Sequence, residues 1–180
     1  MRRCFWCNLN NPIYVYYHDN EWGIPLHNDQ TLFELLSLEI MQAGLSWECI
    51  LNKRIAFRKC FDNFDYHKVA KYDAKKINAL LNNKDIVRNK LKINAVINNA
   101  KVFINIINEY TSFDKYIWTF TNNKVLYNVY QTKNELSDRI SKDLKKRGMK
   151  FVGSTIIYSY LQAIGMINDH ESDCFKHISK

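Results

Sequence analysis

Glycine and proline are scarce in this chain, with 5 Gly and 2 Pro among 180 residues. Few residues are therefore available for the tight turns that connect short strands. Clean alternation of apolar and polar residues is almost absent, whereas apolar residues recur repeatedly at helical spacing. The sequence predicts an all-α protein.

Long apolar segments are also missing. No stretch approaches the roughly 18 uninterrupted apolar residues of a transmembrane helix, and the start, Met1-Arg2-Arg3-Cys4, lacks the apolar centre of a signal peptide. A hydrophobic content of 47% in 180 residues suffices for one compact unit over residues 1–180. We expect a cytoplasmic monomer with no membrane partner.

Acidic residues are outnumbered, since 26 Lys and Arg against 18 Asp and Glu give a net charge of +8. This balance favours a polyanionic partner such as nucleic acid. A general richness in Lys, Asn and Ile gives the same charge without any ligand. The grouping of the cations is therefore more informative than their total.

The periodicity predicts helices and one surface loop, at 122–135. The expected helices cover 29–43, 47–60, 66–71, 74–82, 88–110, 113–121, 137–147 and 154–166. Candidate N-caps are Asp65, Asp73, Ser112, Ser137 and Ser154, and Gly148 suits the position after a helix end.

Glu39 lies on the apolar face of the helix expected at 29–43. At helical spacing it stacks with Leu32, Leu35 and Leu36, whereas Glu34 falls toward the wetter side. An unpaired buried charge is costly. Either this face is turned to a pocket, or Glu39 is a core residue hydrogen-bonded to backbone or tyrosine.

Trp47 follows a turn that brings it close to Glu39. Gly44 suits the end of the first helix, and Ser46 can cap the next one. An aromatic ring and a carboxylate both favour a cation. The pair therefore indicates a site for a planar, positively charged ligand.

Two expected helices meet in a short polar turn within residues 77–95. A helix-hairpin-helix here, over about 74–110, can present backbone N–H groups to a DNA phosphate. Arg88, Lys90 and Lys92 supply nearby cations. The pattern has low specificity because the usual glycine-rich turn is absent.

Cysteine and histidine residues gather near both chain ends. Cys4, Cys7 and His18 lie near the start, and His170, Cys174 and His177 near the end. Such residues can bind zinc by bringing the termini together. Spacing leaves the choice between Cys4 and Cys7 open, and free thiols with solvated histidines are the alternative.

Several blocks together resemble the 3-methyladenine DNA glycosylase I family. They are Arg3-Cys4, Tyr14, residues 17–23, Leu38-Glu39, residues 42–47, residues 144–153 and residues 168–170. They run nearly from end to end, in order and at family spacing. The chain departs from the pattern at Asp85 and Leu91, where relatives carry glycines.

The resemblance implies a fold and a metal. The fold is that of the helix-hairpin-helix DNA glycosylase superfamily, in which structural Zn²⁺ joins segments 1–25 and 150–180. Its ligands would be Cys4, His18, His170 and Cys174. Four protein ligands leave no open coordination position, so the metal would stabilise rather than catalyse.

The resemblance also implies base excision repair by an N-glycosyl hydrolase. Such an enzyme flips 3-methyladenine out of alkylated double-stranded DNA and releases the free base without strand cleavage. Glu39 would be catalytic and Trp47 stacked on the base, with Tyr14 and Tyr17 in the pocket wall and Trp22 nearby.

Other tyrosines and two other functions complete these expectations. Tyr16, Tyr158 and Tyr160 are expected in the core. One alternative function is a non-catalytic, zinc-stabilised module that binds DNA damage, which retention of both Glu39 and Trp47 disfavours. The other is a zinc hydrolase of a small molecule, which would need an open metal position.

Overall fold

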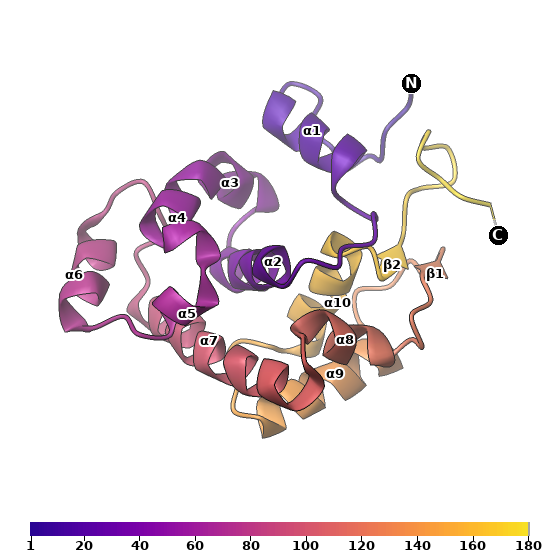
Figure 1. The fold of residues 1–180 in the computed structure, drawn as a ribbon. Coiled ribbons are helices and arrows are strands. Elements are labelled where there is room, and N and C mark those ends of the chain that lie inside the picture. The colour runs from indigo at the N-terminus through magenta and orange to yellow at the C-terminus, as the bar shows by residue number, and fades with distance from the viewer. Residues whose placement is uncertain (180) are drawn as a thin grey trace.

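The computed structural model describes residues 1–179 and is mainly helical, as predicted. Its elements in chain order (Figure 1) are α1 (Pro12–Asn20), α2 (Asp29–Gln42), α3 (Trp47–Asn52), α4 (Arg54–Cys60), the 3₁₀ turn η1 (Asp62–Phe64), α5 (Tyr66–Val69), α6 (Ala74–Asn82), α7 (Lys90–Tyr110), α8 (Phe113–Thr119), β1 (Leu126–Tyr127), α9 (Glu135–Lys146), α10 (Ser154–Ala163) and β2 (Ile167–Asn168).

Helix α2 lies at the centre of the molecule (Figure 1). Asn28 starts it by accepting a hydrogen bond from Thr31 N, and every residue from Leu32 to Met41 is buried. A helix that is apolar on nearly all sides is expected in the interior. Because α2 is enclosed by its neighbours, Glu39 near its end has a fixed position.

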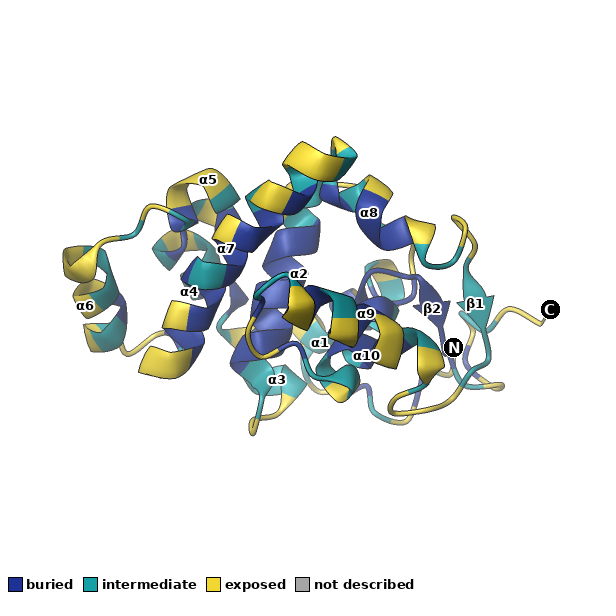
Figure 2. Cartoon of the chain, turned by 90° about the horizontal axis from the view of Figure 1, so that it is seen from below, coloured by how far each residue is buried: buried dark blue, intermediate teal, exposed yellow. Residues whose placement is uncertain are grey.

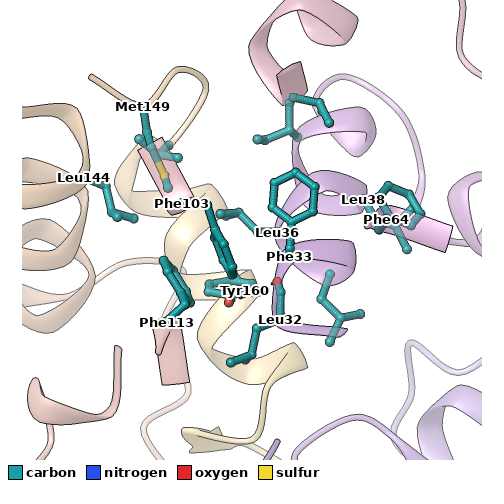
Figure 3. Close-up of a cluster of buried hydrophobic side chains, with 14 of the residues drawn as sticks. Leu32, Phe33, Leu36, Leu38, Phe64, Phe103, Phe113, Leu144, Met149 and Tyr160 are labelled. Carbon is teal, nitrogen blue, oxygen red and sulfur yellow. Dashed lines mark hydrogen bonds between the residues drawn. The ribbon is translucent and has the colours of Figure 1, made fainter. Parts of the chain in front are cut away.

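Aromatic rings fill the space between α2 and the helices around it (Figure 3). The Phe33 and Phe103 ring centroids are 5.2 Å apart in an edge-to-face arrangement, and Phe103 stacks on Phe113 at 4.1 Å. Such ring pairs add to the stabilisation from area burial. Tyr158 and Tyr160 are buried, as predicted.

Most predicted helix ends are confirmed. Ser46, Asp65, Asp73 and Ser112 each accept a backbone hydrogen bond at a helix start, and Gly148 has a φ of +98° after α9. Two predicted caps are wrong. Asn134 rather than Ser137 caps α9, with Ser137 completing a capping box, and Ser154 is the first residue of α10 rather than its cap.

Three other features of the fold differ from the prediction. The helix expected at 47–60 is two helices, α3 and α4, separated at Lys53. Helix α1 was not predicted, because its apolar residues form no clear stripe, and its Tyr16 is 61% exposed rather than in the core. The expected loop 122–135 contains β1, which pairs in parallel with β2 (Figure 2).

Glu34 is buried, contrary to the prediction of a wetter position. Its carboxylate accepts hydrogen bonds from Arg54 Nε at 2.7 Å and Arg58 Nε at 2.8 Å. Two guanidinium groups from α4 therefore compensate this charge, which a pattern of apolar spacing does not reveal.

No helix within residues 1–179 is both long enough and apolar enough to cross a membrane.

Candidate functional site

A cavity of about 290 Å³ opens beside the C-terminal half of α2. Its aromatic lining comes from distant parts of the chain, namely Trp6, Tyr14, Tyr17, Trp22, Trp47 and Tyr130. Its polar lining is Glu39, Gln42, Ser159, Gln162, Asp169 and Glu171. Ring faces with a few converging polar groups are typical of a pocket for a flat organic ligand.

Glu39 has no hydrogen-bond or ion-pair partner within residues 1–179. The side chain is only 4% exposed, and its burial raises the pKa of the carboxyl group to about 8. The alternative of a core glutamate bonded to backbone or tyrosine is therefore wrong. Glu39 faces the cavity, where a ligand can supply the missing partner.

Trp47 also carries an unsatisfied polar group. Its Nε1 is buried and has no hydrogen-bond partner, and its ring lies 5.4 Å from that of Tyr17, tilted by 56°. Helix α3 fixes Trp47 because Ser46 caps that helix. The cavity wall thus carries a fixed indole and, within residues 1–179, an unpaired carboxyl group.

All four aromatic residues predicted for a base pocket line the cavity, and two more do so. Trp6 was not predicted, although its ring lies 5.4 Å from Tyr14 and 4.9 Å from Trp22. Trp6 lies between Cys4 and Cys7, and the sequence pattern there indicated only the two thiols. Tyr130 lies in the segment predicted as a loop, where no pattern identified it.

The two terminal segments lie near each other (Figure 1) and form a second site, whose His170 contacts the cavity residue Trp22. Cys4, His18, His170 and Cys174 are all buried, and their ligand atoms lie within 4.8 Å of one another. Cys4 Sγ is 3.4 Å and Cys174 Sγ 3.6 Å from His170 Nδ1, and Cys174 Sγ is 3.5 Å from His18 Nε2. This cluster could hold a metal ion.

The donor set and its spacing fit a tetrahedral ion. Zinc bonds of about 2.3 Å to sulfur and about 2.0–2.1 Å to nitrogen place tetrahedral S and N ligands about 3.6 Å apart. Burial lowers the pKa of His18 and that of His170, the latter to about 4, so both rings are neutral ligands at pH 7. Cys7 and His177 lie outside the cluster.

The second nitrogen of each histidine is also held. His18 Nδ1 is 2.8 Å from Asp19 Oδ1, and Arg3 Nη2 donates to the same carboxylate at 2.7 Å. His170 Nε2 is 3.2 Å from the carbonyl oxygen of Trp22. Such outer partners orient metal-binding imidazoles. The contact with Trp22 connects the metal cluster to the cavity wall.

Comparison with known proteins decides the family. A family profile described as methyladenine glycosylase matches residues 6–177. The chain belongs to the methyladenine glycosylase family. It is 42% identical to DNA-3-methyladenine glycosylase 1 of Escherichia coli (strain K12), covering 97% of this chain and 96% of that protein.

Two further matches support the assignment of this chain to the methyladenine glycosylase family. DNA-3-methyladenine glycosylase of Haemophilus influenzae (strain ATCC 51907 / DSM 11121 / KW20 / Rd) is 40% identical over 96% of each chain. A crystal structure of 3-methyladenine DNA glycosylase I matches with a TM-score of 0.94, 40% identity and coverage of 98% of this chain and 100% of that chain.

A structure that describes 3-methyladenine recognition by the Staphylococcus aureus enzyme matches equally well. Its TM-score is 0.94 at 35% identity, with coverage of 100% of this chain and 98% of that chain. The resemblance and the helical fold predicted from the sequence are thus confirmed.

The cations predicted to contact DNA in this glycosylase-family chain differ in surroundings. Arg88 and Lys90 are exposed just before and at the start of α7. Lys92 is buried, and its Nζ donates to the carbonyl oxygens of Met41, at 2.9 Å, and Ala43. The prediction of a phosphate contact for Lys92 is therefore wrong. Its charge instead neutralises the C-terminal end of α2.

Only some of the basic side chains at the end of α9 are likewise available to bind a phosphate. Lys145 and Lys146 are exposed. Arg147, however, donates to Asp143 at 2.7 Å and to Glu109 at 2.5 Å. These carboxylates hold the guanidinium in place, so Arg147 is not free to bind a phosphate.

A second helical hairpin lies nearer the cavity than the α6–α7 turn. Residues 147–153 join α9 to α10, and α10 begins without a side-chain cap. A cavity of about 190 Å³ lies between Thr155 and Ile156 of α10 and the turn after α2, and it shares Glu39 and Ser159 with the larger cavity. The start of α10 is thus at the rim of the site.

Proposed function

We propose that this protein is a DNA-3-methyladenine glycosylase, which extrudes the methylated base from alkylated double-stranded DNA and releases it by hydrolysis. One observation carries the proposal. Within residues 1–179 the buried carboxyl group of Glu39 has no partner, and it lines the same aromatic cavity as Trp47. Together they match a flat cation that carries hydrogen-bonding groups.

The chemistry of the substrate explains this arrangement. Adenine methylated at N3 carries a positive charge, which weakens its bond to the sugar and makes it a good leaving group. The protein must therefore mainly capture the extruded base and favour the charged form. Ordinary adenine is neutral and gains little from a buried carboxylate.

The charge of Glu39 is coupled to binding of the base. Because burial raises the pKa of Glu39 to about 8, the carboxyl group is mostly protonated in the empty pocket at pH 7. A cationic base favours the carboxylate and lowers this pKa, so capture releases a proton. The resulting carboxylate also stabilises positive charge that develops on the sugar as the bond breaks.

Cleavage of the base alone, without strand cleavage, agrees with the lining of the cavity. A lyase needs an amine that forms a Schiff base with the sugar. None of the lining residues is a lysine. Water is therefore the nucleophile that we propose.

Zinc is the ion that we propose for Cys4, His18, His170 and Cys174. Two thiolates and two imidazoles in a buried tetrahedral arrangement suit Zn²⁺. Such a set is closed, which argues against a zinc-activated water. The proposed role of the ion is to join the two chain ends.

DNA contacts are proposed for the exposed cations near the cavity and for the start of α10. The first-turn N–H groups of α10 have no side-chain cap, so they can bind a phosphate next to the extruded nucleotide. The helix-hairpin-helix at about 74–110 stays a prediction, with Arg88 and Lys90 as its cations.

The direct test is base release from methylated duplex DNA by the purified protein. We expect free 3-methyladenine in the supernatant and one abasic site per released base, with no strand breaks before alkaline treatment. Binding to the methylated duplex with no release of base would instead favour the non-catalytic damage-binding module.

Two substitutions at Trp47 test whether its ring stacks on the methylated base. Trp47→Ala is expected to weaken capture of the methylated base by about 1–3 kcal/mol, the range for base–aromatic stacking. Trp47→Phe keeps a smaller aromatic ring, so its affinity should lie between those of the unaltered protein and Trp47→Ala. Titration with free 3-methyladenine measures both losses, and equal affinities for all three proteins would exclude a contact with the base.

Salt dependence tests the proposed phosphate contacts. Changing Arg88, Lys90, Lys145 or Lys146 singly to Gln should reduce the slope of log K against log salt by about one for each true contact. Lys124→Gln, which removes an exposed cation between α8 and β1, is the matched control. Unchanged slopes for all four variants would move the DNA surface elsewhere.

A further inference from the structure

Tyr130 lines the same cavity as Glu39 and Trp47, although it comes from the segment after β1. Its side chain is neither part of the core nor fully in solvent, since the residue is 51% exposed. A large ring left half-open on a pocket wall is available to a ligand.

The backbone of Tyr130 is held in an unfavourable conformation. Its φ is +48°, in the left-handed region that non-glycine residues avoid. Asp169 holds this turn, because its Oδ1 accepts hydrogen bonds from Val129 N at 2.7 Å and Tyr130 N at 3.1 Å. A strained residue persists only where its surroundings determine it, and such residues gather at functional sites.

Asp169 is itself anchored to the cavity wall. The residue is 6% exposed, and its Oδ2 accepts from Tyr158 Oη at 2.6 Å and Gln162 Nε2 at 2.8 Å, both on α10. Helix α10 also supplies Ser159 to the cavity. The position of Tyr130 is therefore fixed relative to the rest of the pocket.

The hydroxyl group of Tyr130 contacts the backbone of the metal cluster, at His170. Its Oη lies 2.9 Å from the carbonyl oxygen of His170 and 3.0 Å from Asn128 Oδ1, and it donates its proton to this pair. With both backbone and hydroxyl held, the ring itself is the part of Tyr130 left to meet a ligand.

The same wall carries a second negative group. Glu171 lines the cavity, and its Oε2 accepts a hydrogen bond from Phe5 N at 2.8 Å. A ring face and a carboxylate side by side both favour a positively charged ligand. Glu39 and Trp47 present the same combination elsewhere in the cavity.

We propose that Tyr130 is a base-binding contact whose ring packs against the extruded methylated base from the side of the metal cluster. The proposal rests on the proposed glycosylase function and adds a second aromatic wall to its pocket. The held backbone and hydroxyl present the ring without a large loss of side-chain freedom on binding.

The test compares Tyr130→Ala and Tyr130→Phe with Tyr16→Ala. Tyr16 is a matched control because it is 61% exposed on α1 and does not line the cavity. Affinity for free 3-methyladenine is followed by quenching of the tryptophans in the cavity. Base release from methylated duplex gives kcat and KM, and thermal unfolding with metal analysis reports on structure.

We expect Tyr130→Ala to bind the base roughly tenfold more weakly, within the range for one base–aromatic contact. Its KM for base release should rise while its metal content stays that of the unaltered protein. Tyr130→Phe keeps the ring and the Asp169 contacts, so it should stay within about twofold, and Tyr16→Ala should be unchanged.

Three results would overturn the assignment. Tyr130→Ala could bind and release the base as Tyr16→Ala does, which would make Tyr130 a surface residue. Both Tyr130 variants could lose metal and thermal stability together, which would make its role structural. If the unaltered protein neither binds nor releases 3-methyladenine, the proposed function fails and this inference fails with it.

Discussion

Replacing Glu39 by glutamine is expected to slow the release of 3-methyladenine from methylated duplex DNA by roughly 10²- to 10³-fold, the usual effect of removing one electrostatic contact to a transition state. The amide keeps the size of the side chain but removes the charge that complements the cationic base. Binding to undamaged duplex should change little, because phosphate contacts carry it.

The pH dependence of this effect has a definite sign. The profile of kcat/KM reports groups of the free enzyme. Since burial raises the pKa of Glu39 to about 8, kcat/KM for the cationic substrate should rise with pH up to about 8 and then level off. The Glu39→Gln profile should lack this rise.

Stability provides the control for Glu39→Gln. The pKa of Glu39 in the folded chain, about 8, exceeds its ordinary value of 4.5, so the folded state binds this proton more tightly than the unfolded state. The unfolding free energy therefore falls as pH rises from about 4.5 to about 8, at up to about 1.4 kcal/mol per unit. The glutamine variant should avoid that loss and be the more stable protein at pH 8.

A Glu39→Gln protein that releases base at the unaltered rate would show that the carboxyl group has no part in the reaction. Unequal unfolding at acid pH, where both side chains are neutral, would instead reveal a packing defect in the variant.

The helices with strong periodicity were predictable because their apolar residues all face the protein interior. Helix α9 is the clearest case, since its buried residues Ser137, Ile140, Ser141 and Leu144 recur at helical spacing. Helix α1 has no such stripe. Its Tyr17 and His18 point inward for the cavity and the metal cluster, which depend on contacts distant in sequence.

Apart from the family resemblance, the site was predictable where a residue conflicts with its local pattern. Glu39 does so as a carboxyl group on an apolar face. Lys92 is the opposite case. A lysine in a polar turn gives no sign that its Nζ donates to the carbonyl oxygens of Met41 and Ala43. Tyr130 and Asp169 meet only through the fold, so no spacing reveals them.

Loss of the proposed zinc ion is expected to have the largest effect on stability. The four proposed ligands connect residues 4 and 18 to residues 170 and 174, so the ion closes a loop over almost the whole chain. Binding free energy at such a site adds to folding free energy, and structural zinc reaches about 10–16 kcal/mol in small zinc-binding peptides. His170→Ala, or chelation, should therefore lower the melting temperature markedly.

Cys7→Ser is the matched control for the metal site. Cys7 is a buried thiol near the same chain end, and its Sγ lies 3.9 Å from the carbonyl oxygen of Tyr14 rather than in the cluster. The Cys7→Ser protein should retain one equivalent of metal, whereas Cys4→Ser and His170→Ala should lose it. Full thermal stability of a metal-free protein would contradict the assignment.

Loss of the proposed ion should affect the cavity residues that contact the cluster, among them Trp22 and Tyr130. His170 Nε2 contacts the carbonyl oxygen of Trp22 at 3.2 Å, and Trp22 contacts Trp6, so this wall loosens when the cluster opens. Glu39 is carried by α2 in the interior and is not one of the four cluster residues. Protein that remains folded without the ion, measured below its lowered melting temperature, should therefore bind 3-methyladenine more weakly yet retain some base release, and the rise of kcat/KM toward pH 8 should persist.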